Sequence, residues 1–217
     1  MIKAALFDMD GTLVNNTKVH QQAFDVFCTR YGVADWQEKF DAVIGMGNDD
    51  IMRHLLPEEI IQKKGLPALA EEKEAIYREI YAPTIQPVKG LVELLKMLQA
   101  AGIRCAVGSS GCKKNVDFVL DKCGIDSYFD ARISGDMVSH CKPHPEIYLT
   151  AAKTLGVKPE ECVVFEDAGA GFEAARRAGV KQVIALTTSF SREHIEQSFE
   201  VDRIITDFCD IKTPEEL

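Results

Sequence analysis

The stretch Phe7-Asp8-Met9-Asp10-Gly11-Thr12 follows a short apolar run that begins at Ile2 and is interrupted only by Lys3. An apolar run that ends in a sharp switch to polar residues is typical of a buried parallel strand. Because side chains alternate along an extended chain, Asp8 and Asp10 point to the same side of it. Two carboxylates this close in a low-dielectric pocket need a cation or a shared proton. The stretch therefore predicts a strand end that carries chemistry, although a plain strand followed by an Asp/Gly turn has the same composition.

The size and charge of the chain limit the functions that it can have. The 217 residues suffice for a full core and one inserted subdomain. Apolar residues make up 46% and charged residues 27%, as in ordinary soluble proteins. The net charge of −9 argues against a general nucleic-acid or membrane-surface binder, whose footprint would be basic. An anionic substrate remains compatible, because the field inside a pocket can oppose the global one.

The cysteines and the N-terminus point to a cytoplasmic protein. None of the seven cysteines forms a CxxC pair, and their number is odd: Cys28, Cys105, Cys112, Cys123, Cys141, Cys162 and Cys209. We expect reduced, mostly buried thiols. A basic segment followed by a long apolar one is absent from the N-terminus, so we expect no signal peptide. No apolar run approaches the ~20 residues of a membrane span.

The sequence between the first strand and Pro83 has helical patterning only. From Thr17 to Tyr31 apolar residues recur on one helical face, with Asn15 or Asn16 available as a cap. Shorter helical patterns follow, and a further helix is predicted from about Pro67 to Tyr81. An all-helical block directly after the first strand predicts an inserted cap domain.

After Pro83 helices and strands alternate. Buried strands are predicted at residues 103–107, 131–134, 162–165 and 183–186, with a possible edge strand at 204–205. Such alternation predicts a parallel sheet with helices on both faces. The expected fold is α/β: a doubly wound, Rossmann-like core of residues 1–15 and 84–217, with an all-helical cap of residues 16–83.

Three of the predicted buried strands end in polar side chains. These are Asp8 and Asp10, then Ser109 and Ser110, then Glu166 and Asp167, and Lys142 adds a cation. Open parallel sheets bind ligands at the carboxyl ends of their strands. Carboxylates that leave room for water suit Mg²⁺, whereas hydroxyls and a lysine suit phosphoryl oxygens. The set predicts a phosphate held against a divalent cation.

Four motifs resemble those of the haloacid dehalogenase superfamily of phosphotransferases. They are Asp8-Met9-Asp10-Gly11-Thr12, Val107-Gly108-Ser109, Lys142-Pro143-His144-Pro145 and Val163-Val164-Phe165-Glu166-Asp167-Ala168-Gly169. All four occur in the family's order, and the resemblance extends over nearly the whole chain. The helical insert between the first two resembles the cap of the β-phosphoglucomutase-like branch. The carbon–halogen hydrolases of the superfamily lack an aspartate at the place of Asp10, so its presence favours phosphoryl transfer.

The resemblance implies a role for each residue of the set. Asp8 would be the nucleophile that forms an aspartyl-phosphate, and Asp10 would protonate the leaving oxygen and then activate water. Mg²⁺ would be held by Asp8, the backbone carbonyl of Asp10 and Asp167, with Glu166 as a ligand or just behind one. Phosphate would be bound by Ser109, Ser110 and Lys142. In the cap, His20 and Asn48 are the candidate substrate contacts.

Most of these residues also have an ordinary structural interpretation. A lone lysine such as Lys142 is usually solvated, and the pair Glu166-Asp167 also fits a helix N-cap. Ser110 would equally cap the following helix. His20 matches a histidine of β-phosphoglucomutase, but a lone helix histidine is more often incidental. The other histidines, which are His54, His140, His144 and His194, have no recognisable metal-ligand spacing.

Three functions are compatible with this set of residues. The first is a Mg²⁺-dependent phosphatase that hydrolyses a small phosphorylated metabolite, such as a sugar phosphate, under a closing cap. The second is a hexose-phosphate mutase of the β-phosphoglucomutase kind. The third is a non-catalytic regulatory protein, against which the intact set of acids, serine and lysine argues. We expect a monomer, with no nucleic-acid or membrane partner.

The cap sequence favours hydrolysis over the mutase. A mutase must grip the second phosphate of its substrate with cations. In β-phosphoglucomutase a lysine and an arginine of the first cap loop have this task, and the matching places here hold Ile44 and Asn48. Among the cap residues, only His20 favours the mutase. The basic cap residues that could take the place of the missing lysine and arginine are Arg53 and Lys73.

Overall fold

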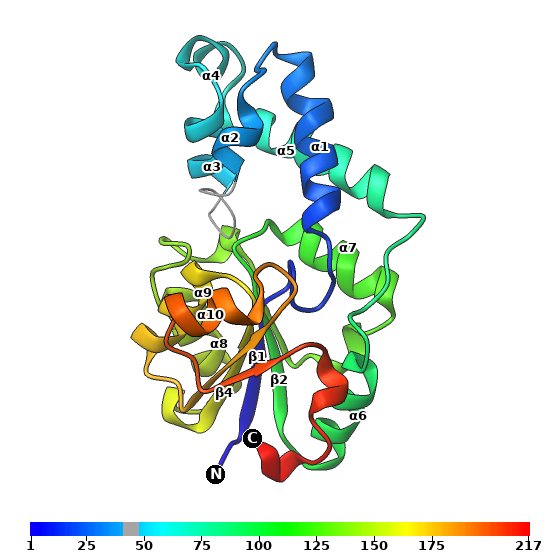
Figure 1. Cartoon of the computed structure of the whole chain (residues 1–217), viewed down its shortest axis with the longest axis vertical. Helices are drawn as coiled ribbons and strands as arrows, with labels where there is room; N and C mark the ends of the chain where they lie inside the picture. The colour runs from blue at the N-terminus through cyan, green and yellow to red at the C-terminus, as the bar shows by residue number, and fades with distance from the viewer. Residues whose placement is uncertain (41–47) are drawn as a thin grey trace.

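A computed structural model describes residues 1–40 and 48–217 of the chain. Its core is a six-stranded sheet in the order β3-β2-β1-β4-β5-β6, in which every neighbouring pair is parallel (Figure 1). The strands are β1 (Ala4–Phe7), β2 (Arg104–Gly108), β3 (Ala131–Ile133), β4 (Cys162–Glu166), β5 (Gln182–Leu186) and β6 (Arg203–Ile205). The first strand of the chain is therefore in the middle of the sheet, flanked by β2 and β4.

The helices fall into two groups. Five follow β1 and lie together above the sheet: α1 (Thr17–Arg30), α2 (Trp36–Phe40), α3 (Asn48–Leu55), α4 (Glu58–Lys64) and α5 (Leu66–Tyr81) (Figure 1). The others alternate with the remaining strands: α6 (Leu91–Ala100), α7 (Lys113–Cys123), α8 (Glu146–Leu155), α9 (Gly169–Ala178) and α10 (Arg192–Ser198). Short 3₁₀ turns occur at Asp126–Tyr128, Gly135–Met137, Pro159–Glu161, Phe208–Asp210 and Pro214–Glu216.

Strand β1 divides the hydrophobic core in two. Its four side chains are fully buried and alternate between the faces of the sheet. Ala4 and Leu6 belong to a cluster with α8 and α9, whereas Ala5 and Phe7 belong to a larger one with α6, α7 and the cap helices. Phe7 stacks on Phe165 of β4, with ring centroids 4.7 Å apart. A strand buried on both faces must be apolar throughout, which explains why the first polar residues after it mark its end.

The predicted fold class is confirmed: a doubly wound parallel sheet with an inserted helical cap. The strands and the edge strand β6 lie within two residues of their predicted positions. Helices α4 and α10, each of seven residues, were not predicted individually. The exact division into residues 1–15 with 84–217 and residues 16–83 stays a prediction.

The capping role expected of Asn16 is wrong. Asn16 occupies the N-cap position of α1, but its side chain makes no cap hydrogen bond. The amide instead donates to Asp10 Oδ1 at 2.6 Å and to the hydroxyl of Tyr77 at 2.7 Å. Its side-chain oxygen accepts from the backbone N–H of Gly11 at 3.1 Å. The side chain thus turns away from its own helix and joins the end of β1 to the cap.

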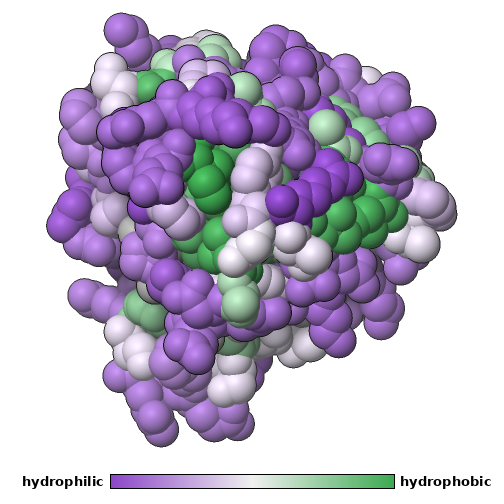
Figure 2. All heavy atoms as spheres, turned by 90° about the horizontal axis from the view of Figure 1, so that it is seen from above, coloured by the Kyte–Doolittle hydropathy of each residue, from purple (hydrophilic) through white to green (hydrophobic). Residues whose placement is uncertain are grey.

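From the cap end, most of the exposed surface is hydrophilic, and apolar side chains gather in separate patches (Figure 2). None of the helices within the described residues has the length and apolar character needed to cross a bilayer.

The buried face of α6 should contribute strongly to stability. Leu95 is fully buried there, so Leu95→Ala should lower the free energy of unfolding by about 2–5 kcal/mol, through lost transfer energy and a residual cavity. The matched change Val26→Ala, at a side chain that is 39% exposed on α1, should cost less than about 0.5 kcal/mol. Urea unfolding followed by circular dichroism measures both. Equal losses would contradict the described packing of α6.

Candidate active site

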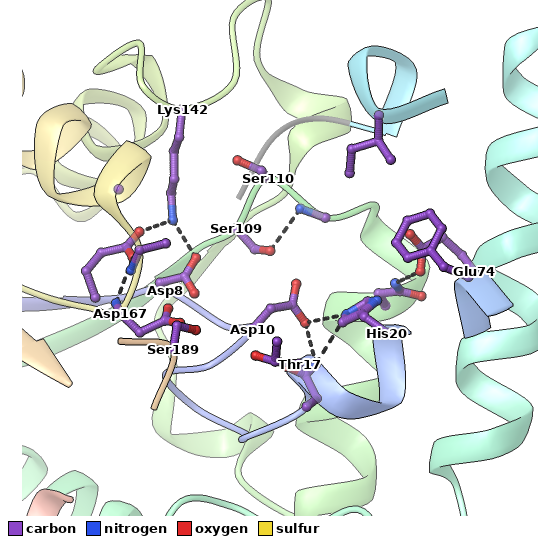
Figure 3. Close-up of a pocket in the computed structure, with 18 of the residues that line it drawn as sticks. Asp8, Asp10, Thr17, His20, Glu74, Ser109, Ser110, Lys142, Asp167 and Ser189 are labelled. Atoms are coloured by element: carbon purple, nitrogen blue, oxygen red, sulfur yellow. Dashed lines mark hydrogen bonds and ion pairs between the residues drawn. The ribbon is translucent and has the colours of Figure 1, made fainter. Parts of the chain in front are cut away.

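The carboxyl ends of β1 and β4 bring three acids and one lysine together in a buried cluster (Figure 3). Asp8 follows β1, Glu166 ends β4 and Asp167 follows it. Lys142 extends into the cluster from the loop before α8, and its ammonium contacts Asp8 Oδ1 and, at 2.5 Å, Glu166 Oε1. Since Lys142 is only 4% exposed, the interpretation of a solvated surface lysine is wrong.

Each carboxylate oxygen of Glu166 accepts two hydrogen bonds. Its Oε1 accepts from Lys142 and from the hydroxyl of Tyr148 at 2.8 Å. Its Oε2 accepts from the backbone N–H groups of Asp167 at 2.9 Å and Ala168 at 3.2 Å, both of which precede the first residue of α9. The interpretation of Glu166 and Asp167 as a helix N-cap pair is therefore wrong, since Ala168 occupies the N-cap position of α9 and the helix has no side-chain cap hydrogen bond. The Glu166 carboxylate fixes the ammonium of Lys142 against Asp8.

Two hydroxyls hold the side chain of Asp167. Thr12 donates to Asp167 Oδ1 at 3.3 Å, and Ser189, in the loop after β5, donates to Asp167 Oδ2. Next to them, Gly11 has a φ of +86°, and a Cβ there would collide with the Asp167 carboxylate. Only glycine allows the chain to turn at this point and leave room for the acid.

Asp10 lies on the cap side of Asp8 and takes part in a separate network. Its Oδ1 accepts from Asn16 and lies 3.3 Å from Nε2 of His20. Tyr77 stacks on the His20 ring with centroids 4.0 Å apart. Burial works to raise the pKa of Asp10, but the hydrogen bond and charge of His20, together with the bond from Asn16, hold it below the usual value. His20 is thus brought to the acid rather than being incidental on its helix.

The end of β2 supplies the hydroxyls. Ser109 accepts from the backbone N–H of Gly111 at 3.0 Å, which leaves its own hydrogen free to donate. Ser110 does not cap α7, since Cys112 occupies the N-cap position. Within the described part of the chain, the buried side-chain atoms without a hydrogen-bond partner are Ser110 Oγ and Ser134 Oγ. Because Ser110 lines the pocket, its unpaired hydroxyl is suited to an incoming oxyanion.

The cap closes the other side of the pocket. Its lining residues there are Thr17, His20, Phe24, Ile51, Lys73 and Glu74. Lys73 and Glu74 are both buried and form an ion pair at 2.5 Å. Glu74 Oε2 also accepts from Asn115 of α7 at 2.6 Å, and Arg78 donates to the same asparagine at 2.7 Å. Asn115 therefore links the cap helix α5 to the core.

The acidic cluster fits a divalent cation. Ligand oxygens of Asp8, Glu166 and Asp167 all lie within 4.8 Å of one another. Burial raises the pKa of Asp8 well above its usual value, an effect that Lys142 offsets and the neighbouring acids reinforce. Burial and the charge of Glu166 raise the pKa of Asp167 to about 8. One ammonium does not balance three buried carboxylates, so a further cation such as Mg²⁺ suits the oxygen-only donor set.

The structure therefore brings together the predicted residues Asp8, Asp10, Ser109, Ser110, Lys142, Glu166, Asp167 and His20 in one pocket. Asn48 is the first residue of α3, and its side chain and the preceding loop residues 41–47 are outside the described part. Sequence reasoning missed Ser189, although it also follows a strand end. It also missed the buried roles of Asn16, Lys73, Glu74 and Asn115, whose polar side chains look solvated in sequence.

One sequence expectation about the histidines is corrected. His140 and His144 lie with Glu146 close enough for their ligand atoms to share one ion. The proline-containing loop brings the residues together, which their spacing alone did not indicate. Among the described residues, His54 and His194 join no such group.

The chain is similar to known phosphatases. Residues 2–179 match the family model of haloacid dehalogenase-like hydrolases. The chain is 32% identical to validoxylamine A 7'-phosphate phosphatase of Streptomyces hygroscopicus subsp. limoneus, over 99% of this chain and 98% of that protein. It is 34% identical to fructose-1-phosphate phosphatase YqaB of Escherichia coli, over 82% of this chain and 93% of that protein.

Solved structures share the whole fold. CbbY from Rhodobacter sphaeroides in complex with phosphate superposes with a TM-score of 0.85 at 28% identity, covering 100% of this chain and 99% of that one. β-Phosphoglucomutase from Clostridium difficile gives a TM-score of 0.82 at 25% identity, covering 98% and 94%.

The raised pKa of Asp167 makes a prediction about stability. An aspartate of the unfolded chain titrates near pH 4, so between about pH 4 and pH 8 the folded, metal-free protein holds this proton more tightly. The free energy of unfolding in chelator should therefore fall as pH rises through this window. Mg²⁺ should stabilise the protein more at pH 8 than at pH 5. Melting temperatures with Mg²⁺ and with chelator at both pH values measure this.

The control is Asp167→Asn, which removes the ionisable group but keeps its shape. This variant should lose part of the pH dependence in chelator and part of the stabilisation by Mg²⁺. An identical pH profile for wild type and Asp167→Asn would contradict the assignment of the shifted group.

Proposed function

The chain belongs to the haloacid dehalogenase-like hydrolase family, and on that premise we propose that it hydrolyses a small sugar monophosphate with Mg²⁺ through an aspartyl-phosphate on Asp8. The prediction of an enzyme of the phosphatase kind is confirmed by the family model that matches residues 2–179 and by the phosphatases matched over 99% and 82% of this chain. The observation that carries the proposal is the buried contact of Lys142 with Asp8, beside the free hydroxyls of Ser109 and Ser110.

The first half-reaction begins with Asp8. Its carboxylate oxygen attacks phosphorus, the new O–P bond forms, and the bond from phosphorus to the sugar oxygen breaks. Lys142 and the hydroxyls of Ser109 and Ser110 neutralise and orient the phosphoryl oxygens. The leaving oxygen takes a proton from Asp10, which is left ionised, with Nε2 of His20 3.3 Å from its Oδ1.

The second half-reaction reverses the task of Asp10. A water attacks phosphorus, Asp10 accepts its proton, and the O–P bond to Asp8 breaks to release phosphate. The hydrogen bonds of Asn16 and His20 hold the pKa of Asp10 below its usual value in the free protein, which favours the ionised form that accepts this proton. In the first half-reaction the negative charge of the bound phosphate opposes this effect and favours the protonated form that acts as the acid. The proposed roles of the two acids differ because their surroundings differ. Asp8 contacts Lys142 in the core, whereas Asp10 contacts Asn16 and His20 on the cap side.

Asp8 and Asp167 would hold Mg²⁺, and Glu166 would act through Lys142. When bound, the cation offsets the repulsion between the anionic nucleophile and the phosphate. The hydroxyls of Thr12 and Ser189 each donate to one carboxylate oxygen of Asp167 and so fix its orientation. Glu166 has no free hydrogen-bonding capacity on either oxygen, and we assign it to holding Lys142 rather than to direct metal binding.

The charge balance of the cap favours a substrate with one phosphate. Lys73 is the cap cation that lines the pocket, and its charge is already balanced by Glu74 at 2.5 Å. A second phosphate dianion would have to displace Glu74 or lie beside it, which costs electrostatic energy. His20, Glu74 and Asn115 instead offer hydrogen bonds to neutral hydroxyls. The phosphatases matched over most of this chain are named for a 7'-phosphate and a 1-phosphate, which agrees with such a substrate.

We assign residues 16–83 to a cap that closes over the core. Asn115 of α7 holds α5 through Glu74 and Arg78, and Lys114 adds an exposed ion pair to Glu71 at 2.9 Å. A closed cap excludes bulk water from the first half-reaction and strengthens the interactions inside.

The nucleophile can be tested directly. Asp8→Asn should lower the release of phosphate by roughly a thousandfold or more, because an amide does not attack phosphorus. The control Asp25→Asn, at an exposed acid of α1, should be fully active. A colorimetric phosphate assay on a panel of sugar phosphates with Mg²⁺, and mass spectrometry of acid-quenched wild type for phosphorylated Asp8, measure both points. If the folded Asp8→Asn protein retains more than about a tenth of the activity, Asp8 is not the nucleophile.

The substrate class has its own test. The specificity constant kcat/KM should be higher for sugar monophosphates than for the corresponding bisphosphates. Glu74→Gln should free the charge of Lys73 and shift this ratio toward the bisphosphates, whereas Glu79→Gln, at an exposed position of the same helix, should not. A ratio that does not respond to Glu74→Gln would refute the role of the ion pair.

The mutase alternative is tested in the same assays. We expect little conversion of β-glucose 1-phosphate to glucose 6-phosphate in the presence of a bisphosphate activator, measured by a coupled dehydrogenase. Mutase turnover well above phosphate release would replace the hydrolase proposal, while leaving Asp8 as nucleophile.

A further inference from the structure

A second group of metal-binding side chains lies outside the buried acidic cluster, on the loop that carries Lys142. We infer that His140, His144 and Glu146 form a binding site for a divalent transition-metal ion, with Zn²⁺ as the best match to the donors. The ligand atoms of the three residues lie within 4.8 Å of one another. This inference does not depend on the proposed reaction.

The distances suit a tetrahedral ion. Nδ1 of His140 lies 3.0 Å from Glu146 Oε2, and Nδ1 of His144 lies 3.8 Å from the same oxygen. Zinc bonds to nitrogen and oxygen are about 2.0–2.1 Å, which puts neighbouring tetrahedral ligands about 3.3 Å apart. The two measured separations lie on either side of this value, so small side-chain rotations would bring the three ligand atoms to three of the four tetrahedral positions. Water would take the fourth.

The three donors are held before an ion arrives. Glu146 Oε1 accepts from the backbone N–H of Ser139 at 2.8 Å, and Oε2 accepts from that of His140 at 3.0 Å. The centroids of the two imidazole rings lie 4.6 Å apart, and the ring planes are tilted by 37°. A metal ion would replace the proton between Nδ1 of His140 and the carboxylate, and it would displace the hydrogen bond that Nδ1 of His144 accepts from the backbone N–H of Glu146 at 3.3 Å. The backbone hydrogen bonds to the Glu146 carboxylate would keep orienting that ligand.

The donor chemistry separates this site from the buried one. Two imidazoles and one carboxylate select Zn²⁺ or Co²⁺, whereas carboxylates alone suit Mg²⁺. The side chains of His140 and His144 are 65% and 49% exposed, so an ion can reach them without opening the cap. An ion there would tie together the backbone on both sides of Lys142 and restrict the loop that positions its ammonium.

Binding can be measured without the reaction. The full-length protein, freed of metal and supplied with saturating Mg²⁺, should bind one equivalent of Co²⁺ with the intense visible absorption of a four-coordinate ion, and Zn²⁺ should displace it. His140→Ala and His144→Ala should each weaken binding by about tenfold or more, since even the loss of an outer partner of a ligand costs that much. His54→Ala, at an exposed histidine of α3, and Asp167→Asn should bind as wild type does.

Two further measurements test the metal site without the histidine variants. Zn²⁺ should protect His140 and His144 of the wild-type protein, but not His54, from carbethoxylation followed by mass spectrometry, which requires no variant to fold. Cys141→Ser should bind Co²⁺ unchanged. Wild-type affinity in both histidine variants, loss of binding in Cys141→Ser, or absence of protection would each overturn the site.

Discussion

The burial of three carboxylates around one ammonium is the constraint on which the rest of the structure depends. Asp8, Glu166 and Asp167 are each less than a tenth exposed, and within residues 1–40 and 48–217 Lys142 is the cation that pairs with this cluster. Removing charges from water is costly unless each is paired and hydrogen-bonded. Glu166 meets this demand with four partners and Asp167 with two hydroxyls. The remaining imbalance of charge is what makes the pocket receptive to a cation and a phosphate.

The sheet topology creates this concentration of charge. The central strand β1 is flanked by β2 and β4, which come about 100 and 160 residues later in the chain. Because the three strands are parallel, their polar ends meet at one edge. The apolar cores on both faces hold the strands rigidly, so that the side chains beyond them have few ways to move apart. Preorganisation of this kind is what lets fixed groups act on a developing charge.

A buried polar network joins the cap helices to the core beside the active site. Asp10, Asn16, His20 and Tyr77 are connected by hydrogen bonds and ring stacking, and Lys73, Glu74 and Asn115 continue toward α7. Such a network is stable only while its members satisfy one another. The network therefore ties the orientation of Asp10, the acid that exchanges protons in the proposed reaction, to the positions of α1 and α5.

The order of the motifs and the patterns of apolar residues by themselves determined the fold class, the strands and the placement of the main candidate site residues in one pocket. Asp8 and Asp167 were predictable because buried strands are apolar until they end, so a polar residue there marks the functional edge. The roles of Asn16, Glu74 and Ser189 were not predictable, since a polar side chain looks the same in sequence whether it faces water or a partner far along the chain. The same holds for His140 and His144, which the loop brings to Glu146. Tertiary structure alone decided these contacts, because hydrogen bonds and ion pairs depend on positions within a few ångströms in space, whereas periodicity records only which face of an element is buried.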